Sequence, residues 1–205
     1  MSRSRGSVVV LAALFAACSG SPTTAPGETT RYTTDDGRLQ IAVPARFVAV
    51  DLTADDPQVP VEVEDKEAVA MLERVIDSLD PEMFEFWAFD PEHTTSEFAP
   101  TLSVTRFPGG PDHTAESYTT QLPPAFASLG MTMSGSEFVE LEGGTALLVE
   151  IATDPNLPVQ YHSLAFYVFD LDVVYNVSVT YRDEFSDHAR DEFVEAFSQT
   201  SLLDS

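Results

Sequence analysis

The segment VVYNVSVTYR, residues 173–182, alternates apolar and polar side chains along its length. Its odd-numbered positions are all Val or Tyr, whereas its even-numbered positions are polar from Asn176 onwards. An alternation of period two predicts a β-strand with one buried and one solvent-exposed face. A strand of this kind is typical of an antiparallel sheet that is covered on one side.

Five more segments, placed before this one in the chain, have the composition of strands. They are residues 84–89, 101–107, 131–141, 145–153 and 160–169. Glycines 143 and 144 predict a hairpin between two of these segments, and Asp170-Leu171-Asp172 predicts a turn before residue 173. Near the start of the domain, residues 32–34 and 39–43 flank Asp35-Asp36-Gly37, which is a tight-turn sequence. The sequence therefore predicts a six-stranded set preceded by a short hairpin.

Three segments have helical periodicity: residues 65–79, 114–129 and 186–199. Asp65 is placed to cap the first helix. Pro123-Pro124 predicts a broken or kinked second helix, and Gly130 predicts its end. Because no long linker or internal repeat interrupts residues 31–205, we expect one α+β domain.

The chain is strongly acidic, with 10 Lys and Arg against 34 Asp and Glu and a formal net charge of −24. Nucleic-acid binding requires clustered positive charge, so nucleic acid is excluded as a partner. The same charge repels an anionic membrane surface. A single cysteine excludes a disulfide framework within the chain and a four-cysteine zinc site.

The N-terminus has the pattern of a targeting segment. Arg3 and Arg5 precede an apolar run over residues 8–17, which is too short to span a bilayer, and Cys18 follows directly. A cysteine after two alanines resembles the bacterial lipobox, which implies a signal peptide at 1–17, a lipid on Cys18 and anchoring at the outer face of the cell membrane. The small, polar residues up to 30 predict a flexible tether (18–30). The alternative is an ordinary secretory signal cleaved near residue 17.

The phrase DGRLQIAVP (36–44), the strand and helix of 173–203 and the order of elements resemble the actinobacterial LpqN-type lipoproteins. Their domain resembles the PsbP fold of the photosystem extrinsic subunits. The resemblance implies a curved antiparallel β-sheet with helices packed on it, a PsbP-like α/β/α sandwich. It also implies a binding or assembly role, and it supplies no catalytic motif.

The residues themselves contain no recognisable catalytic, cofactor or metal motif. None of the histidines (His93, His113, His162 and His188) is paired at i+4, and no nucleophile elbow or phosphate-binding loop is present. Two acidic groups, Asp51/Asp55/Asp56 and Asp170/Asp172, are either solvated faces or weak divalent-ion sites. We therefore expect a protein without enzymatic activity, cofactor or metal.

Two aromatic segments are the candidate binding surfaces. In residues 84–89, Trp87 and Phe89 share one face, and in the strand 160–169 the aromatic residues occupy both faces, with Tyr161, Tyr167 and Phe169 as candidates. These residues either belong to the core or line an apolar groove or partner patch.

Three functions remain open at this stage. An adaptor for envelope proteins predicts an exposed apolar patch around Trp87 and no deep cavity. A carrier of a lipid or small apolar ligand predicts an apolar cavity between sheet and helices. An unrecognised hydrolase predicts a His or carboxylate pair in a cleft.

Overall fold

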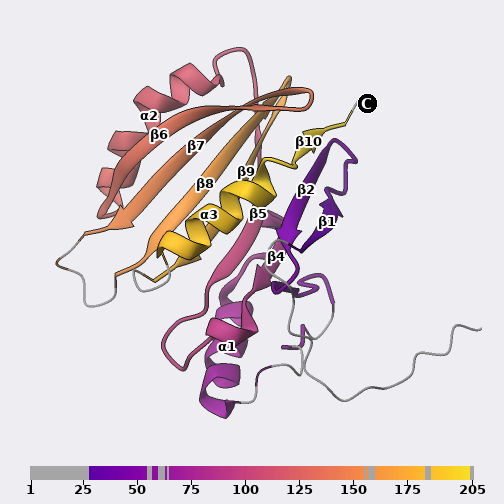
Figure 1. Ribbon diagram of the computed structural model, residues 1–205, viewed down its shortest axis with the longest axis vertical. Helices are drawn as coiled ribbons and strands as arrows, with labels where there is room; N and C mark the ends of the chain where they lie inside the picture. Colours follow the sequence, from indigo (N-terminus) through magenta and orange to yellow (C-terminus); the bar gives the residue numbers. More distant parts are fainter. Residues whose placement is uncertain are drawn as a thin grey trace, which may run out of the picture.

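A seven-stranded antiparallel sheet forms the centre of the molecule (Figure 1). The computed structural model describes residues 28–54, 57–59, 63, 65–154, 156, 160–182 and 186–203. Cys18, the predicted signal peptide and most of the predicted tether lie outside these residues.

The strands of the large sheet lie in the order β3-β4-β5-β9-β8-β7-β6. They are β3 (Val48–Ala49), β4 (Phe84–Phe89), β5 (Thr101–Pro108), β6 (Met131–Leu141), β7 (Gly144–Thr153), β8 (His162–Asp170) and β9 (Val173–Tyr181). All six strands predicted from the sequence are present, so the predicted α+β class is confirmed. The two-residue strand β3 was not predicted.

A second, smaller sheet is built from both ends of the described chain. The predicted hairpin forms its strands β1 (Thr29–Thr33) and β2 (Leu39–Pro44), and β10 (Ser201–Leu202) pairs with the other edge of β2. The strand β1 therefore includes Thr29 and Thr30, which the sequence predicts to be part of the tether.

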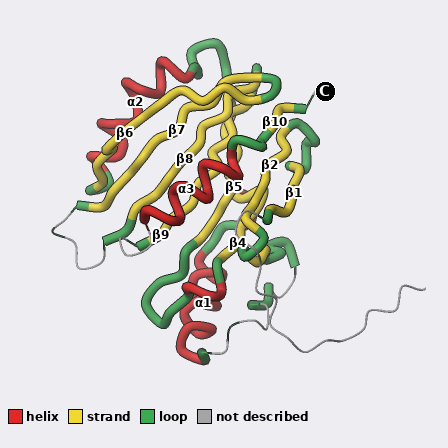
Figure 2. Tube along the Cα trace, viewed as in Figure 1, coloured by secondary structure: helices red, strands yellow, loops and turns green. Residues whose placement is uncertain are grey.

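The three helices lie close to their predicted positions, at α1 (Lys66–Ser78), α2 (Ala115–Ser128) and α3 (Ser186–Phe197) (Figure 2). The Asp65 side chain caps α1 by accepting a hydrogen bond from the backbone N–H of Glu67. Both prolines lie inside α2, which continues across them as one helix, so the prediction of a break is wrong. Gly130 follows it with φ +71°, as the sequence predicted.

One face of the large sheet is covered by α3 together with the small sheet (Figure 1). Leu39 and Ile41 of β2 are fully buried in this core. Phe166 of β8 stacks on Phe197 of α3, with 3.3 Å between the ring centroids. The small sheet and α3 therefore complete the main core by covering this face together.

The opposite face is covered in two places. The helix α2 packs on β6 and β7, and α1 packs on β4 through Leu72 and Ile76. Val174 is buried beside α2, which corrects the prediction that this side of residues 173–182 is solvent-exposed. Ser178 and Thr180 lie farther along the same side of β9 and are half-buried. The helices α1 and α2 cover the two flanks of this face, so its middle strands, β5 and β9, are covered less completely.

The tight turn at residues 35–37 is fastened to the large sheet. Asp36 accepts a hydrogen bond from the Tyr175 hydroxyl and pairs with Arg106 at 3.3 Å. Arg38 pairs with both Asp170 and Asp172 at 2.8 Å. These two carboxylates therefore hold Arg38, and with it the turn, against the large sheet.

Candidate functional site

A hollow of about 330 Å³ lies between α2 and the large sheet, and we call it the α2 hollow. The sheet contributes its floor and the helix its wall. Its lining consists of aromatic, aliphatic and amide side chains, namely Phe107, Tyr118, Gln121, Leu122, Ala125, Tyr167 and Asn176.

Strand register brings the floor residues together. Thr105 of β5 is paired with Asn176 of β9, which is paired in turn with Tyr167 of β8. On the helix side, Tyr118 packs edge-on against Tyr167 and Phe169, with ring centroids 5.3 and 5.0 Å apart. A polar row on the sheet therefore meets an aromatic cluster beneath α2.

The α2 hollow is uncharged at neutral pH. None of its described lining residues is an acid or a base other than tyrosine. Burial, helped by the neighbouring Tyr118, raises the pKa of Tyr167 to about 12, so this phenol stays protonated. The described lining of the hollow therefore offers no charged partner to an ionic ligand.

Two polar atoms have no hydrogen-bond partner among the described residues: Oδ1 of Asn176, which lines the floor, and Oγ1 of Thr105, the residue paired with Asn176 on β5. An unsatisfied buried polar atom costs roughly 1–3 kcal/mol. Most such atoms in folded proteins are satisfied by protein or water. The α2 hollow therefore combines apolar walls with unused hydrogen-bonding capacity.

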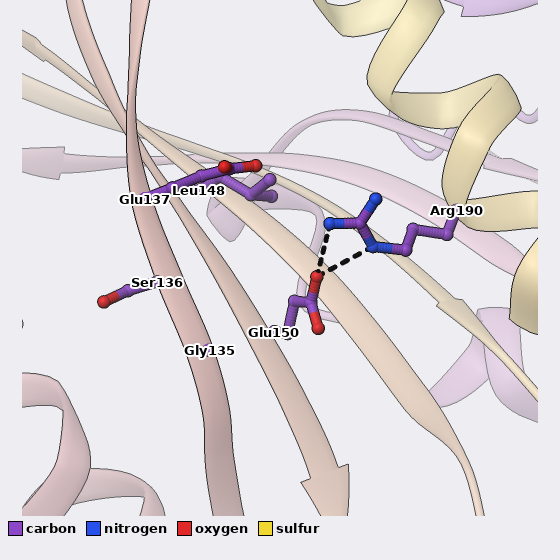
Figure 3. A pocket seen from close by; sticks show the side chains of 6 residues that line it. All are labelled: Gly135, Ser136, Glu137, Leu148, Glu150 and Arg190. Atoms are coloured by element: carbon purple, nitrogen blue, oxygen red, sulfur yellow. Dashed lines mark hydrogen bonds and ion pairs between the residues drawn. The ribbon is translucent and has the colours of Figure 1, made fainter.

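A second hollow, of about 200 Å³, lies beside α3 and is shown in Figure 3. Arg190 of α3 reaches across it to Glu150 of β7, with 2.7 and 2.8 Å between its nitrogens and one carboxylate oxygen. Glu137 and the bulged strand at Gly135 form the far wall. Because the arginine is already paired, this hollow offers no free cationic group for an anion.

A histidine–carboxylate pair is present on the loop that follows β4. Asp90 is 1% exposed and accepts hydrogen bonds from Nδ1 of His93 at 2.8 Å and from Nε of Arg46 at 2.6 Å. Arg46 also pairs with Glu192 of α3. Through Arg46, the Asp90 carboxylate therefore connects the loop to α3. Asp90, His93 and Arg46 together form a structural cluster.

The other predicted metal or catalytic candidates do not converge. Nδ1 of His113 lies 3.2 Å from the Tyr118 hydroxyl, and the His162 ring stacks on Tyr181. The side chain of His188 and residues 55–56 lie outside the described part of the chain. Within that part, no group of three His, Cys, Asp or Glu side chains is placed to hold a metal ion.

The predicted surface residues fall into three groups. Trp87 and Phe89 are 3% and 0% exposed beneath α1, so they form no exposed patch. Tyr161 is half-buried, and its backbone pairs with Thr153. Tyr167 lines the α2 hollow and Phe169 packs beside it. Periodicity did not identify Thr105 and Asn176, because only strand register shows that they are neighbours.

A third hollow, of about 430 Å³, lies beside β4. Trp87 and Phe86 contribute to its lining, so Trp87 borders a cavity even though it is not an exposed residue.

A scan against protein-family models and a search of curated proteins found no match for this chain. Among solved structures, it is similar to the cyanobacterial PsbP protein CyanoP of Synechocystis sp. PCC 6803. The two share 14% identity and a TM-score of 0.55, over 92% of this chain and 98% of that one. The chain has a PsbP-like fold.

A second similar structure is LpqN of Mycobacterium tuberculosis, a protein described as involved in cell envelope biogenesis. It shares 12% identity and a TM-score of 0.56, over 86% of this chain and 91% of LpqN. The PsbP-like architecture expected from the sequence is thereby confirmed, and at these identities the likeness concerns the fold alone. None of the helices in the described part of the chain has the length and apolar character needed to cross a bilayer.

Proposed function

We propose that this protein is a non-enzymatic binding protein of the cell envelope, anchored to the membrane by a lipid on Cys18. We further propose that its ligand is a small, uncharged and largely apolar molecule held in the α2 hollow. The single observation that carries this proposal is the hollow itself, which has neutral aromatic walls and, in Oδ1 of Asn176, a lining atom without a hydrogen-bond partner among the described residues. Sites for small molecules commonly combine an apolar lining with a few placed polar groups.

The position of Trp87 favours this function over a protein adaptor that uses a patch around that residue. The adaptor requires an exposed apolar surface there, whereas Trp87 is buried beneath α1. The carrier requires a cavity between the sheet and a helix, and the α2 hollow has that location. A hydrolase receives no support from the histidines, because the Asp90–His93 pair is held by Arg46.

The binding test uses N-phenyl-1-naphthylamine, an uncharged apolar dye that fluoresces in apolar surroundings. We expect saturable binding to the purified protein and a loss of about tenfold in affinity in Ala125→Phe, because the new ring fills the hollow. Ala127→Phe is the matched control, since Ala127 is exposed on the same helix and outside the described lining. Equal affinity of the two variants would place the dye elsewhere and refute the assignment.

The anchor is tested separately by metabolic labelling with palmitate. The wild-type protein should incorporate label and sediment with membranes, whereas Cys18→Ala should do neither. Equal labelling of the two proteins would reject Cys18 as the lipid attachment site.

A further inference from the structure

The hollow beside β4 differs from the α2 hollow in both its walls and its charge. We call it the β4 hollow; its volume is about 430 Å³. It opens at an edge of the large sheet, where β3 pairs with Phe89 and Ala88 and the Val50 N–H donates to the Trp87 carbonyl, so that residues 84–86 have no strand on that side in the described structure. An extended segment of another protein can therefore approach it along this edge.

Aromatic side chains form a large part of its walls. Tyr32 of β1 and Phe84 and Phe86 of β4 are half-buried and line it, and Trp87, which is 3% exposed, borders it. The Tyr32 ring lies 4.5 Å from that of Phe86, and the Tyr32 hydroxyl donates to the backbone carbonyl of Glu85, which fixes the ring in place. Aromatic faces attract cations, so the rings of Tyr32, Phe84 and Phe86 favour a positively charged ligand.

The charged groups of the β4 hollow are all carboxylates. Asp35, Asp51 and Glu85 line it, and no Lys or Arg does so among the described residues. One oxygen of Glu85 pairs with Arg106 at 3.1 Å, and the other accepts a hydrogen bond from the backbone N–H of Asp35. The Asp35 and Asp51 carboxylates have no ion pair with a base of the described chain, so the hollow is negatively charged overall.

Two pKa shifts agree with this charge distribution. The pKa of Tyr32 is raised to about 12, first by burial and then by Asp35, Glu85 and Asp36. The pKa of Asp51 is lowered by hydrogen bonds from the Thr53 side chain and backbone, so this carboxylate is ionised at neutral pH. The negative potential that disfavours the ionised form of Tyr32 also stabilises a cation at the same place.

From the aromatic walls, the carboxylates and the open sheet edge, we infer that the β4 hollow binds an arginine or lysine side chain on an extended segment of a partner protein. The planar guanidinium of arginine stacks on aromatic rings while it donates hydrogen bonds to carboxylates. The chain has only ten bases of its own against 34 acids, which favours a cation supplied from outside. The site is separate from the α2 hollow, so either assignment can fail without the other.

Trp87 makes the test direct, because it is the only tryptophan in the chain and lines the β4 hollow. We expect acetyl-Gly-Arg-Gly-amide to change its fluorescence in a saturable way. Acetyl-Gly-Gln-Gly-amide, which lacks the charge, should bind at least about tenfold more weakly. Guanidinium chloride should bind more weakly than the arginine peptide, because its guanidinium is not joined to a segment that lies along the sheet edge.

Two variants test the carboxylates while leaving the aromatic walls intact. Asp35→Asn and Asp51→Asn should each weaken binding of the arginine peptide several-fold, and the double variant should abolish it. Asp112→Asn is the control, since it makes the same change of charge at an exposed residue near α2. Equal binding of the glutamine peptide, an equal effect of guanidinium alone, or an equal loss in Asp112→Asn would overturn the inference. Dye binding in the α2 hollow should be unchanged in Asp35→Asn.

Discussion

Aromatic contacts between sheet and helix stabilise the core at the scale of single residues. Phe166 is fully buried, and its ring contacts both Phe193 and Phe197 of α3. Removing a buried Phe side chain leaves a cavity and destabilises a protein by roughly 3–5 kcal/mol. We therefore expect Phe166→Ala to lower the free energy of unfolding by about that amount in urea titrations. Phe138→Ala, at a side chain that is 53% exposed, should change it by less than about 1 kcal/mol.

Asp36 makes the stability depend on pH. Burial alone would raise its pKa, but hydrogen bonds from Tyr175, Thr34, the Arg38 backbone and Arg106 outweigh burial and lower it to about 2. A carboxyl whose pKa is lower in the folded state contributes stability above its unfolded pKa, near 3.9, and loses it as the pH falls. The contribution is about 1 kcal/mol after allowance for solvent screening.

The comparison of wild type with Asp36→Asn isolates this contribution. The difference in unfolding free energy should be constant above about pH 5 and should shrink as the pH falls from about 4 towards 2. Urea titrations at a series of pH values, followed by Trp87 fluorescence, measure it. A difference that stays constant down to pH 2 would show that the hydrogen bonds around Asp36 do not favour its ionised form.

At the scale of secondary-structure elements, α2 contains a feature that opposes helix stability. It contains Pro123 and Pro124 in its interior, and each lacks the N–H that would donate to the carbonyl four residues earlier. Pro124 is exposed. Because an interior proline costs a helix about 3 kcal/mol relative to alanine, Pro124→Ala should raise the unfolding free energy by roughly 1–3 kcal/mol. The control Gln121→Ala, at another exposed position of α2, should change the unfolding free energy little. A Pro124→Ala variant that is less stable than the wild type would mean that the proline ring is required for packing.

Periodicity predicted the larger elements of this fold because each buries one face of its own. The strand β9 and the helix α1 show this, with apolar residues at spacings of two and of three to four. The strands β3 and β10 have two residues each, which is too short for any pattern, and neighbouring strands determine where they pair.

The candidate sites were harder to predict, because they depend on contacts distant in sequence. Trp87 was correctly placed on one face with Phe89, but the sequence does not show that α1 covers that face. The alternation in residues 173–182 predicts a solvent-exposed Asn176, whereas this residue lies beneath α2 and lines the floor of the hollow. Register across β5, β9 and β8 aligns Thr105, Asn176 and Tyr167, and single-strand patterns do not specify register.

At the scale of the whole molecule, the charge imbalance affects both folding and binding. The chain carries 34 acids and 10 bases. Five of the described arginines pair with carboxylates: Arg38, Arg46, Arg106, Arg182 and Arg190. Most acids are therefore left to repel one another, which opposes the compact state.

Salt should consequently stabilise this protein. Raising NaCl from 0.01 to 0.1 M shortens the Debye length from roughly 30 to 10 Å, so repulsion between separated carboxylates is screened. Salt also weakens the ion pairs of the arginines, but an exposed pair contributes only about 0–1 kcal/mol to stability. Several of the arginine pairs are partly buried, and salt screens a buried pair less. We expect the urea midpoint at pH 7 to rise over this range, equally in KCl. A falling midpoint would instead show that the ion pairs, above all Arg46 with Asp90 and Arg38 with Asp170, contribute more to stability than the repulsion removes.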